Sequence, residues 1–166
     1  MAKKTDINTL LSFFPEVHMP ITFSEDLVTT FEKENQPLSQ DVIQQYIYEW
    51  EGEVDEFTEF LPCLRLAETE HFHALVYWKG GLLKYEYVLV TLDKKGSLIS
   101  RKPIASTIVE GELIKKSVAQ IDEDFIIHIM AGENVGEEEY DAGRSQAFNM
   151  EILHTGDIIF SFGDEA

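Results

Sequence analysis

Two hairpin patterns of similar spacing constrain the fold of this chain more than any other feature. An apolar or alternating segment runs into a turn closed by glycine at 88–99, and the same arrangement returns at 150–159. A related histidine-bearing pattern precedes each hairpin, at 70–76 and at 124–129. Glycine in such turns supplies the positive φ that tight hairpins require. The repeated pattern predicts two similar antiparallel meanders within one sheet system.

Alternation of apolar and polar residues continues through most of the C-terminal two thirds. At 71–78, for example, alternate residues divide between an apolar face and a more polar one, which is typical of a half-buried strand. We expect seven to eight strands, a number that favours a curled meander, either a barrel or a two-layer sandwich. The expected strands are 71–78, 83–92, 98–104, 113–121, 125–130, 148–152 and 158–162.

The N-terminal third has the 3.6-residue periodicity of short amphipathic helices instead. The first is expected over 7–14 with Thr5 or Asp6 as N-cap. A second should begin at an N-cap Ser24, and a third should run from an N-cap Ser39 to about Gly52. The fold class is therefore α+β and mainly β. A helical arm, 1–60, packs on a meander, 61–166, within a single structural domain.

The composition indicates a compartment as well as a fold. Cys63 is the only cysteine, so no intrachain disulfide can form, and this usage is typical of a reducing environment. The apolar stretch at 7–14 is too short and too polar for a signal peptide. No run approaches the roughly 18 to 20 apolar residues that span a bilayer. We expect a soluble cytoplasmic protein.

The formal net charge of −18 shapes the functional prediction. Acidic residues concentrate in 1–60 and 121–166, and they disfavour nucleic acid and anionic membranes, which proteins bind mainly through Lys and Arg. We therefore expect a non-enzymatic protein that engages a basic protein partner, as inhibitor or immunity proteins do. A purely solvated acidic coat is the alternative. The expected contact residues are Glu51, Glu53, Asp55, Glu56, Glu137, Glu138 and Glu139.

A second functional hypothesis follows from the aromatic residues of the expected strands. If the meander curls around a cavity, it can carry a small ligand against aromatic walls. The candidate lining residues are Tyr77, Trp78, Tyr85 and Tyr87.

A metal-dependent enzyme is the third hypothesis. His71 and His73 lie two apart on an expected strand, so they share a face and could bind a metal together with Glu86 of the next strand. Two surface histidines are the commoner explanation of such a pair. The sequence contains none of the usual hydrolase, nucleotide-binding or zinc signatures, and it assigns no catalytic residue, metal or cofactor.

Overall fold

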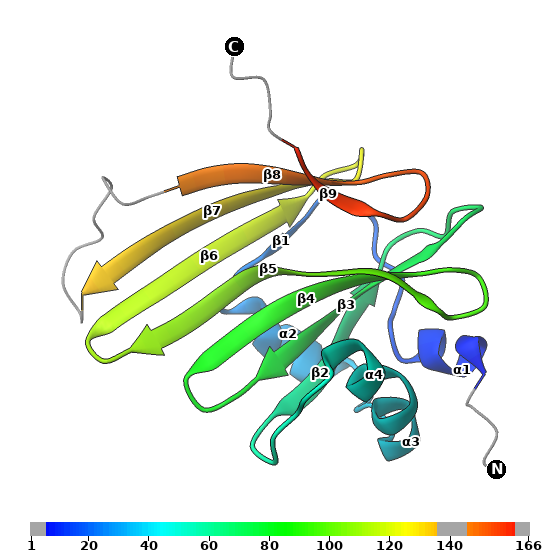
Figure 1. The fold of residues 1–166 in the computed structure, drawn as a ribbon, viewed down its shortest axis with the longest axis horizontal. Coiled ribbons are helices and arrows are strands. Elements are labelled where there is room, and N and C mark those ends of the chain that lie inside the picture. The colour runs from blue at the N-terminus through cyan, green and yellow to red at the C-terminus, as the bar shows by residue number, and fades with distance from the viewer. Residues whose placement is uncertain (1–5, 136–145, 162–166) are drawn as a thin grey trace.

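Eight strands follow one another after an N-terminal group of short helices (Figure 1). The computed structural model describes residues 6–135 and 146–161. The N-terminal elements are α1 (Ile7–Ser12), β1 (Ile21–Phe23), α2 (Leu27–Glu34), α3 (Gln40–Val42), the π-helical turn η1 (Ile43–Ile47) and α4 (Tyr48–Glu51). The long strands are β2 (Glu59–Arg65), β3 (His73–Gly80), β4 (Lys84–Leu92), β5 (Leu98–Glu110), β6 (Leu113–Ile121), β7 (Ile126–Val135), β8 (Gln146–Ile152) and β9 (Ile158–Ser161).

The strands from β2 to β9 form an antiparallel meander, in which each pairs with its neighbour in sequence. This confirms the predicted α+β, mainly β class. The sheet is not closed, because β2 and β9 stand at opposite ends of the strand order. The last hairpin nevertheless folds back onto the middle of the sheet. Thr91 Oγ1 donates to Gly156 O at 2.6 Å, and Ile158 N donates to Ser100 Oγ at 3.3 Å.

The two glycine-closed turns have the same local structure. Gly96 N donates to Asp93 O at 3.0 Å, and Gly156 N donates to Leu153 O at 2.8 Å. Both glycines have the positive φ that the turn requires, 97° and 94°. Gly156 is also closely packed, since a Cβ there would stand 2.8 Å from Ile99 Cδ1. Equivalence of the two halves beyond these turns stays a prediction.

The sheet forks between β5 and β6. These strands pair only from Ser106 opposite Ser117 to Glu110 opposite Leu113. Beyond that point β6 pairs with β1 instead, with Phe23 opposite Ala119. Strand β1 therefore takes the place that β5 vacates, and the chain leaves it towards α2 close to the fork.

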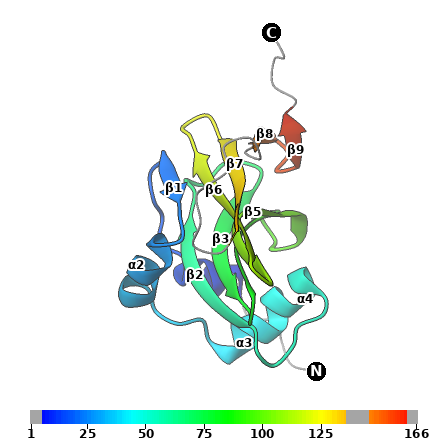
Figure 2. The same ribbon diagram turned by 90° about the vertical axis from the view of Figure 1, so that its left-hand side faces the viewer.

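Strands β3 and β4 are buried on both faces, which divides the core in two. Figure 2 shows α2 and β1 on one side of these strands and α4 on the other. On the first side, Val76 and Leu89 pack with Phe31 of α2. On the second, Leu75 and Val90 are covered by side chains of the helices and of the segment after α1, namely Leu10, Phe14, Val42, Tyr46, Ile47 and Trp50.

Side-chain hydrogen bonds cap the first turns of α1 and α3, and a glycine ends α4. Asp6, one of the two expected caps, accepts a hydrogen bond from Asn8 N at 2.9 Å. Ser39 Oγ accepts one from Val42 N at 3.3 Å, and Gly52 ends α4 with a φ of 81°. The expected cap at Ser24 is wrong, because α2 begins at Leu27 without a side-chain cap. The Ser24 carbonyl instead accepts from Leu27 N, so Ser24 belongs to a preceding turn.

No helix in residues 6–135 and 146–161 has the length and apolar character needed to cross a membrane.

The packing of the helices on β3 and β4 predicts that truncating a helical side chain lowers the free energy of unfolding in proportion to its burial. Ile47 is fully buried, whereas Ile43 on the same helical segment is only partly buried. We expect Ile47→Ala to lower the free energy of unfolding by about 2–5 kcal/mol, because it removes buried methyl groups and leaves a cavity. Ile43→Ala should cost clearly less. Urea denaturation of both variants measures the difference, and equal losses would contradict this packing.

Candidate ligand pocket

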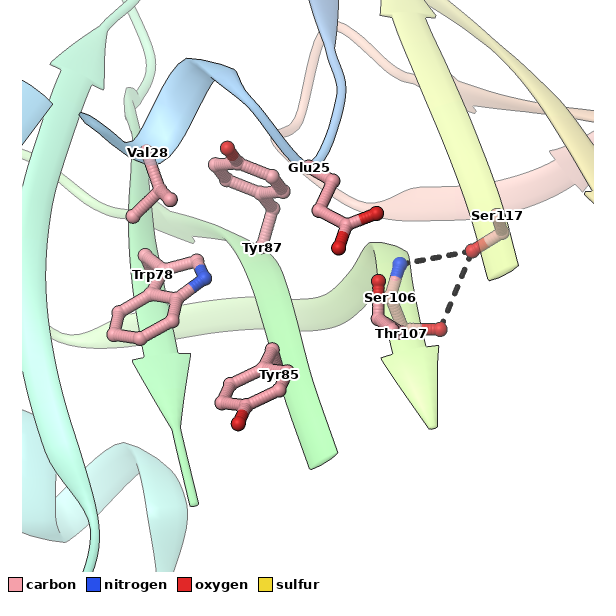
Figure 3. Close-up of a pocket in the computed structure, with 8 residues that line it drawn as sticks. All are labelled: Glu25, Val28, Trp78, Tyr85, Tyr87, Ser106, Thr107 and Ser117. Carbon is pink, nitrogen blue, oxygen red and sulfur yellow. Dashed lines mark hydrogen bonds between the residues drawn. The ribbon is translucent and has the colours of Figure 1, made fainter. Parts of the chain in front are cut away.

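A half-open pocket of about 210 Å³ lies at the fork in the sheet (Figure 3). Its walls come from β3, β4, β5, β6 and the segment where α2 begins. Aromatic side chains stand on one side and hydroxyl groups on the other. The residues that line it are Glu25, Val28, Trp78, Tyr85, Tyr87, Ser106, Thr107 and Ser117.

Three aromatic residues of neighbouring strands form one wall. Trp78 of β3 stands opposite Tyr87 of β4 in the strand register. Tyr85 lies two residues before Tyr87, so it projects from the same face of β4. The Trp78 and Tyr85 rings are nearly parallel, with an interplanar angle of 8° and centroids 5.8 Å apart. The Trp78 and Tyr85 rings therefore stack on each other within this wall.

Gly80 allows the Trp78 indole to take up this position. The indole lies over the backbone of Gly80, where an added Cβ would meet Trp78 Cη2 at 2.2 Å. No side chain fits beneath the ring, so any residue larger than glycine must displace it. At the adjacent Gly81, an added Cβ would meet only Lys84 O, at an ordinary 3.5 Å.

Tyr77 does not belong to the pocket, although the sequence groups it with the other three aromatics. It precedes Trp78 on β3 and therefore points to the opposite face. There its side chain is fully buried beneath the helices, with the Trp50 ring centroid 5.9 Å from its own. The structure thus brings together Trp78, Tyr85 and Tyr87 and separates Tyr77 from them.

The opposite wall is polar and marks the end of the β5–β6 pairing. Ser106 N donates to Ser117 Oγ at 2.9 Å, and the two hydroxyl oxygens lie 3.3 Å apart. Glu25 contributes a carboxylate, with Oε2 at 2.8 Å from Lys116 Nζ outside the pocket lining. This ion pair is about half exposed, with side-chain exposures of 59% for Glu25 and 44% for Lys116.

Tyr87 offers its ring rather than its hydroxyl to the pocket. The hydroxyl donates to Ser24 O at 2.7 Å. Burial raises the pKa of Tyr87 well above its ordinary value, and Cys63 adds to the effect. The phenol therefore remains neutral and keeps its hydrogen bond throughout the physiological pH range.

The structure also separates Glu51 from the acidic strip in which the sequence placed it. Its side chain is only 1% exposed, and it accepts a hydrogen bond from the Tyr77 hydroxyl. Glu51 Oε1 lies 2.6 Å from Lys79 Nζ, and Oε2 lies 2.8 Å from Arg101 Nη2. Glu51 thus connects α4 to β3 and β5 from inside the protein. It is removed from the proposed contact surface.

The pKa of Glu51 reflects two opposing effects. Burial alone would raise it, but hydrogen bonds from Lys79, Tyr77 and Arg101 favour the ionised carboxylate. The net result is a pKa below the ordinary value. The carboxylate therefore remains charged at neutral pH inside the helix–sheet interface.

Other members of the predicted acidic surface remain at the surface where they are described. Glu53, Asp55 and Glu56 are exposed in the connection between α4 and β2. Asp55 Oδ1 accepts a hydrogen bond from Phe57 N at 2.9 Å, which orders this connection locally. Glu137, Glu138 and Glu139 lie outside the described residues.

The candidate metal ligands do not converge. His73 stands opposite Leu92 and Glu86 opposite Lys79, six positions along β3, so the strand rise separates them by about 20 Å. His71 lies before β3 in an exposed turn, with its N–H donating to Thr69 Oγ1 at 3.3 Å. Within 6–135 and 146–161, no three His, Cys, Asp or Glu side chains form a group able to hold a metal ion.

No family model, curated protein or solved structure matches this chain. The pocket must therefore be interpreted from its own chemistry. Sequence patterns give no indication of several lining residues, namely Glu25, Val28, Ser106, Thr107 and Ser117. They meet only because β5 leaves β6 at the fork, and nothing in their local sequence predicts that divergence.

The buried Glu51 cluster predicts a specific dependence of stability on pH. Because the folded-state pKa of Glu51 lies below the ordinary 4.5, its ionised form stabilises the folded protein above that value. This contribution is lost as the pH falls through the folded-state pKa. Glu51→Gln should therefore lower the free energy of unfolding by about 3 kcal/mol near neutral pH, since Lys79 and Arg101 lose their counter-charge.

Urea denaturation at about pH 7 and about pH 3 provides the measurement, and the cost of Glu51→Gln should shrink at the lower pH. Glu53→Gln is the matched control, because its side chain is exposed, and it should change stability by less than about 0.5 kcal/mol. A Glu51→Gln cost that stays constant with pH would contradict the ionised state assigned here.

Proposed function

We propose that this chain is a non-enzymatic binding protein that holds a small ring-bearing molecule in the fork pocket. The observation that carries the proposal is the meeting of Trp78, Tyr85 and Tyr87 on one wall of a half-open cavity. Facing them are the hydroxyls of Ser106, Thr107 and Ser117. Apolar and aromatic walls with a few converging polar groups are the usual composition of a small-molecule site.

The size of the pocket limits the ligand. Apolar cavities of about 150 Å³ accept one benzene ring, and drug-sized molecules require about 300–1,000 Å³. The pocket, at about 210 Å³, lies between these sizes. A single substituted ring is therefore the expected ligand, with its face or edge against Trp78 and its substituent towards the hydroxyls.

Gly80 and Gly81 provide a matched pair of variants for the test. Gly80→Ala forces the Trp78 indole out of the wall, whereas Gly81→Ala adds the same methyl group with an ordinary contact. With p-cresol as probe, Gly80→Ala should weaken binding at least about tenfold, a loss of about 1.4 kcal/mol. Gly81→Ala should leave the affinity within about twofold, well under that loss.

The two tryptophans make the measurement specific. In a ¹H–¹⁵N spectrum, p-cresol should shift the indole N–H signal of Trp78, while Trp50, buried beneath the helices, serves as the internal control. Trp78→Phe shrinks the wall without a clash and removes the indole reporter, so its affinity is measured by titration calorimetry. It should weaken binding even if Gly80→Ala perturbs folding. No shift of the Trp78 signal, or equal effects of the two glycine variants, would contradict the proposal.

We retain a basic protein partner as a second candidate function, because one observation favours it. Phe57 has 55% of its surface exposed within the acidic connection that carries Glu53, Asp55 and Glu56. An exposed aromatic side chain bordered by acidic groups suits a basic partner, since the ring supplies contact area and the carboxylates supply attraction. Glu137, Glu138 and Glu139 remain part of this proposal from sequence alone.

This candidate predicts that association is electrostatically steered. The change Glu53→Gln, Asp55→Asn and Glu56→Gln should slow association with a basic partner isolated at low salt more than it speeds dissociation. A control with the same loss of charge at other exposed positions is Glu112→Gln, Glu123→Gln and Asp124→Asn. Stopped-flow association across a range of salt concentrations distinguishes the two. Equal slowing of association by both triple variants would mean that only the overall charge matters, and it would contradict a contact at 53–57.

A further inference from the structure

The charge of the pocket identifies the chemical class of its ligand more narrowly than its size does. Among residues 6–135 and 146–161, eight line the pocket, and Glu25 is the one charged side chain of these eight. The other contributions are aromatic rings, one valine and hydroxyl groups. A carboxylate beside aromatic faces favours a cation, because the ring quadrupole attracts positive charge as well. We propose that the ligand is a protonated amine. Its ammonium group is attached to a single ring or to an apolar group of similar size.

The protein already places an ammonium group on this carboxylate. Lys116 Nζ lies 2.8 Å from Glu25 Oε2, yet Lys116 does not line the pocket. Its amine therefore contacts Glu25 from outside the residues that line the pocket. Because both side chains are about half exposed, this contact is a weak surface ion pair. A ligand amine that enters from the pocket side can replace it at small cost.

A ligand amine inside the pocket would gain contact with the aromatic rings, which the Lys116 amine lacks. Inside the pocket it lies beside the Trp78, Tyr85 and Tyr87 rings, where less water competes and the attraction between cation and ring is stronger. The hydroxyl oxygens of Ser106 and Ser117 can accept its remaining hydrogens while they keep their mutual contact. Lys116 thus competes with the ligand for Glu25 and does not assist it.

The net charge of −18 acts in the same direction. A strongly negative surface raises the local concentration of small cations and lowers that of anions. This general effect does not depend on any single carboxylate. The specific contribution of Glu25 is therefore distinguished from it by substituting Glu25 alone.

Three probes of similar size and different charge test the inference: phenethylamine, 2-phenylethanol and phenylacetate. We expect phenethylamine to bind at least tenfold more tightly than the alcohol, and phenylacetate to bind most weakly, as measured from the Trp78 indole signal. Glu25→Gln should remove most of the preference for phenethylamine over the alcohol, with the rings and the overall charge retaining the rest, and should leave the affinity of the alcohol unchanged. Lys116→Met should strengthen phenethylamine binding several-fold, because it removes the competing amine. The exposed Glu112→Gln is the control and should change neither.

The inference rests on the proposed small-ligand function, but different results would overturn the two. If the amine and the alcohol bind equally well, the pocket still binds small rings and the ammonium assignment is overturned. The same holds if phenylacetate binds most tightly, or if Lys116→Met weakens the amine as much as Glu25→Gln does. If no probe shifts the Trp78 signal, both the pocket function and the inference are overturned.

Discussion

The burial of β3 and β4 on both faces is the constraint on which the rest of this structure depends. A strand pair covered on two sides needs two separate layers to cover it. The chain supplies α1 and the α3–α4 segment for one face, and β1 with α2 for the other. Consecutive residues of β3 then serve different purposes. Tyr77 points into the helix interface, and Trp78 points into the fork pocket.

Glu51 shows how an ionised group can be part of such an interface. Its carboxylate is surrounded by a phenol and two cations from the sheet, so the charge is compensated where water is excluded. A buried ion pair does not by itself add much stability compared with apolar packing. It does link three elements, since Glu51 of α4 contacts Lys79 of β3 and Arg101 of β5 at once.

Much of the fold could be predicted from the sequence because it is encoded by local patterns. Glycine turns at Gly96 and Gly156, period-two strands and the caps at Asp6 and Ser39 all depend on nearby residues. The second face of β3 could not be predicted as buried, because the helices that cover it come from a distant part of the chain. The sequence favours a surface position for Glu51 for the same reason, since its cationic partners lie far along the sequence.

Part of the pocket could also be predicted from the sequence, because local patterns determine which face of a strand a residue occupies. Alternation places Tyr85 and Tyr87 on one face, and the hairpin register adds Trp78. The grouping of Tyr77 with them is wrong, because Tyr77 precedes Trp78 on β3 and points to the opposite face. Glu25 and the serine pair at Ser106 and Ser117 depend on the fork between β5 and β6. That divergence is a property of the whole sheet, and no short segment encodes it.

The return of the last hairpin has a consequence for the order in which the chain folds. The hydrogen bond from Thr91 Oγ1 to Gly156 O joins residues separated by 65 positions, and Gly156 fits closely against Ile99. This docking requires β4 and β5 to be in place first, because together they form the surface that receives the hairpin. Contacts of such long sequence separation are entropically costly to close and slow the folding of β proteins. The C-terminal hairpin is therefore expected to dock only after β4 and β5 have paired.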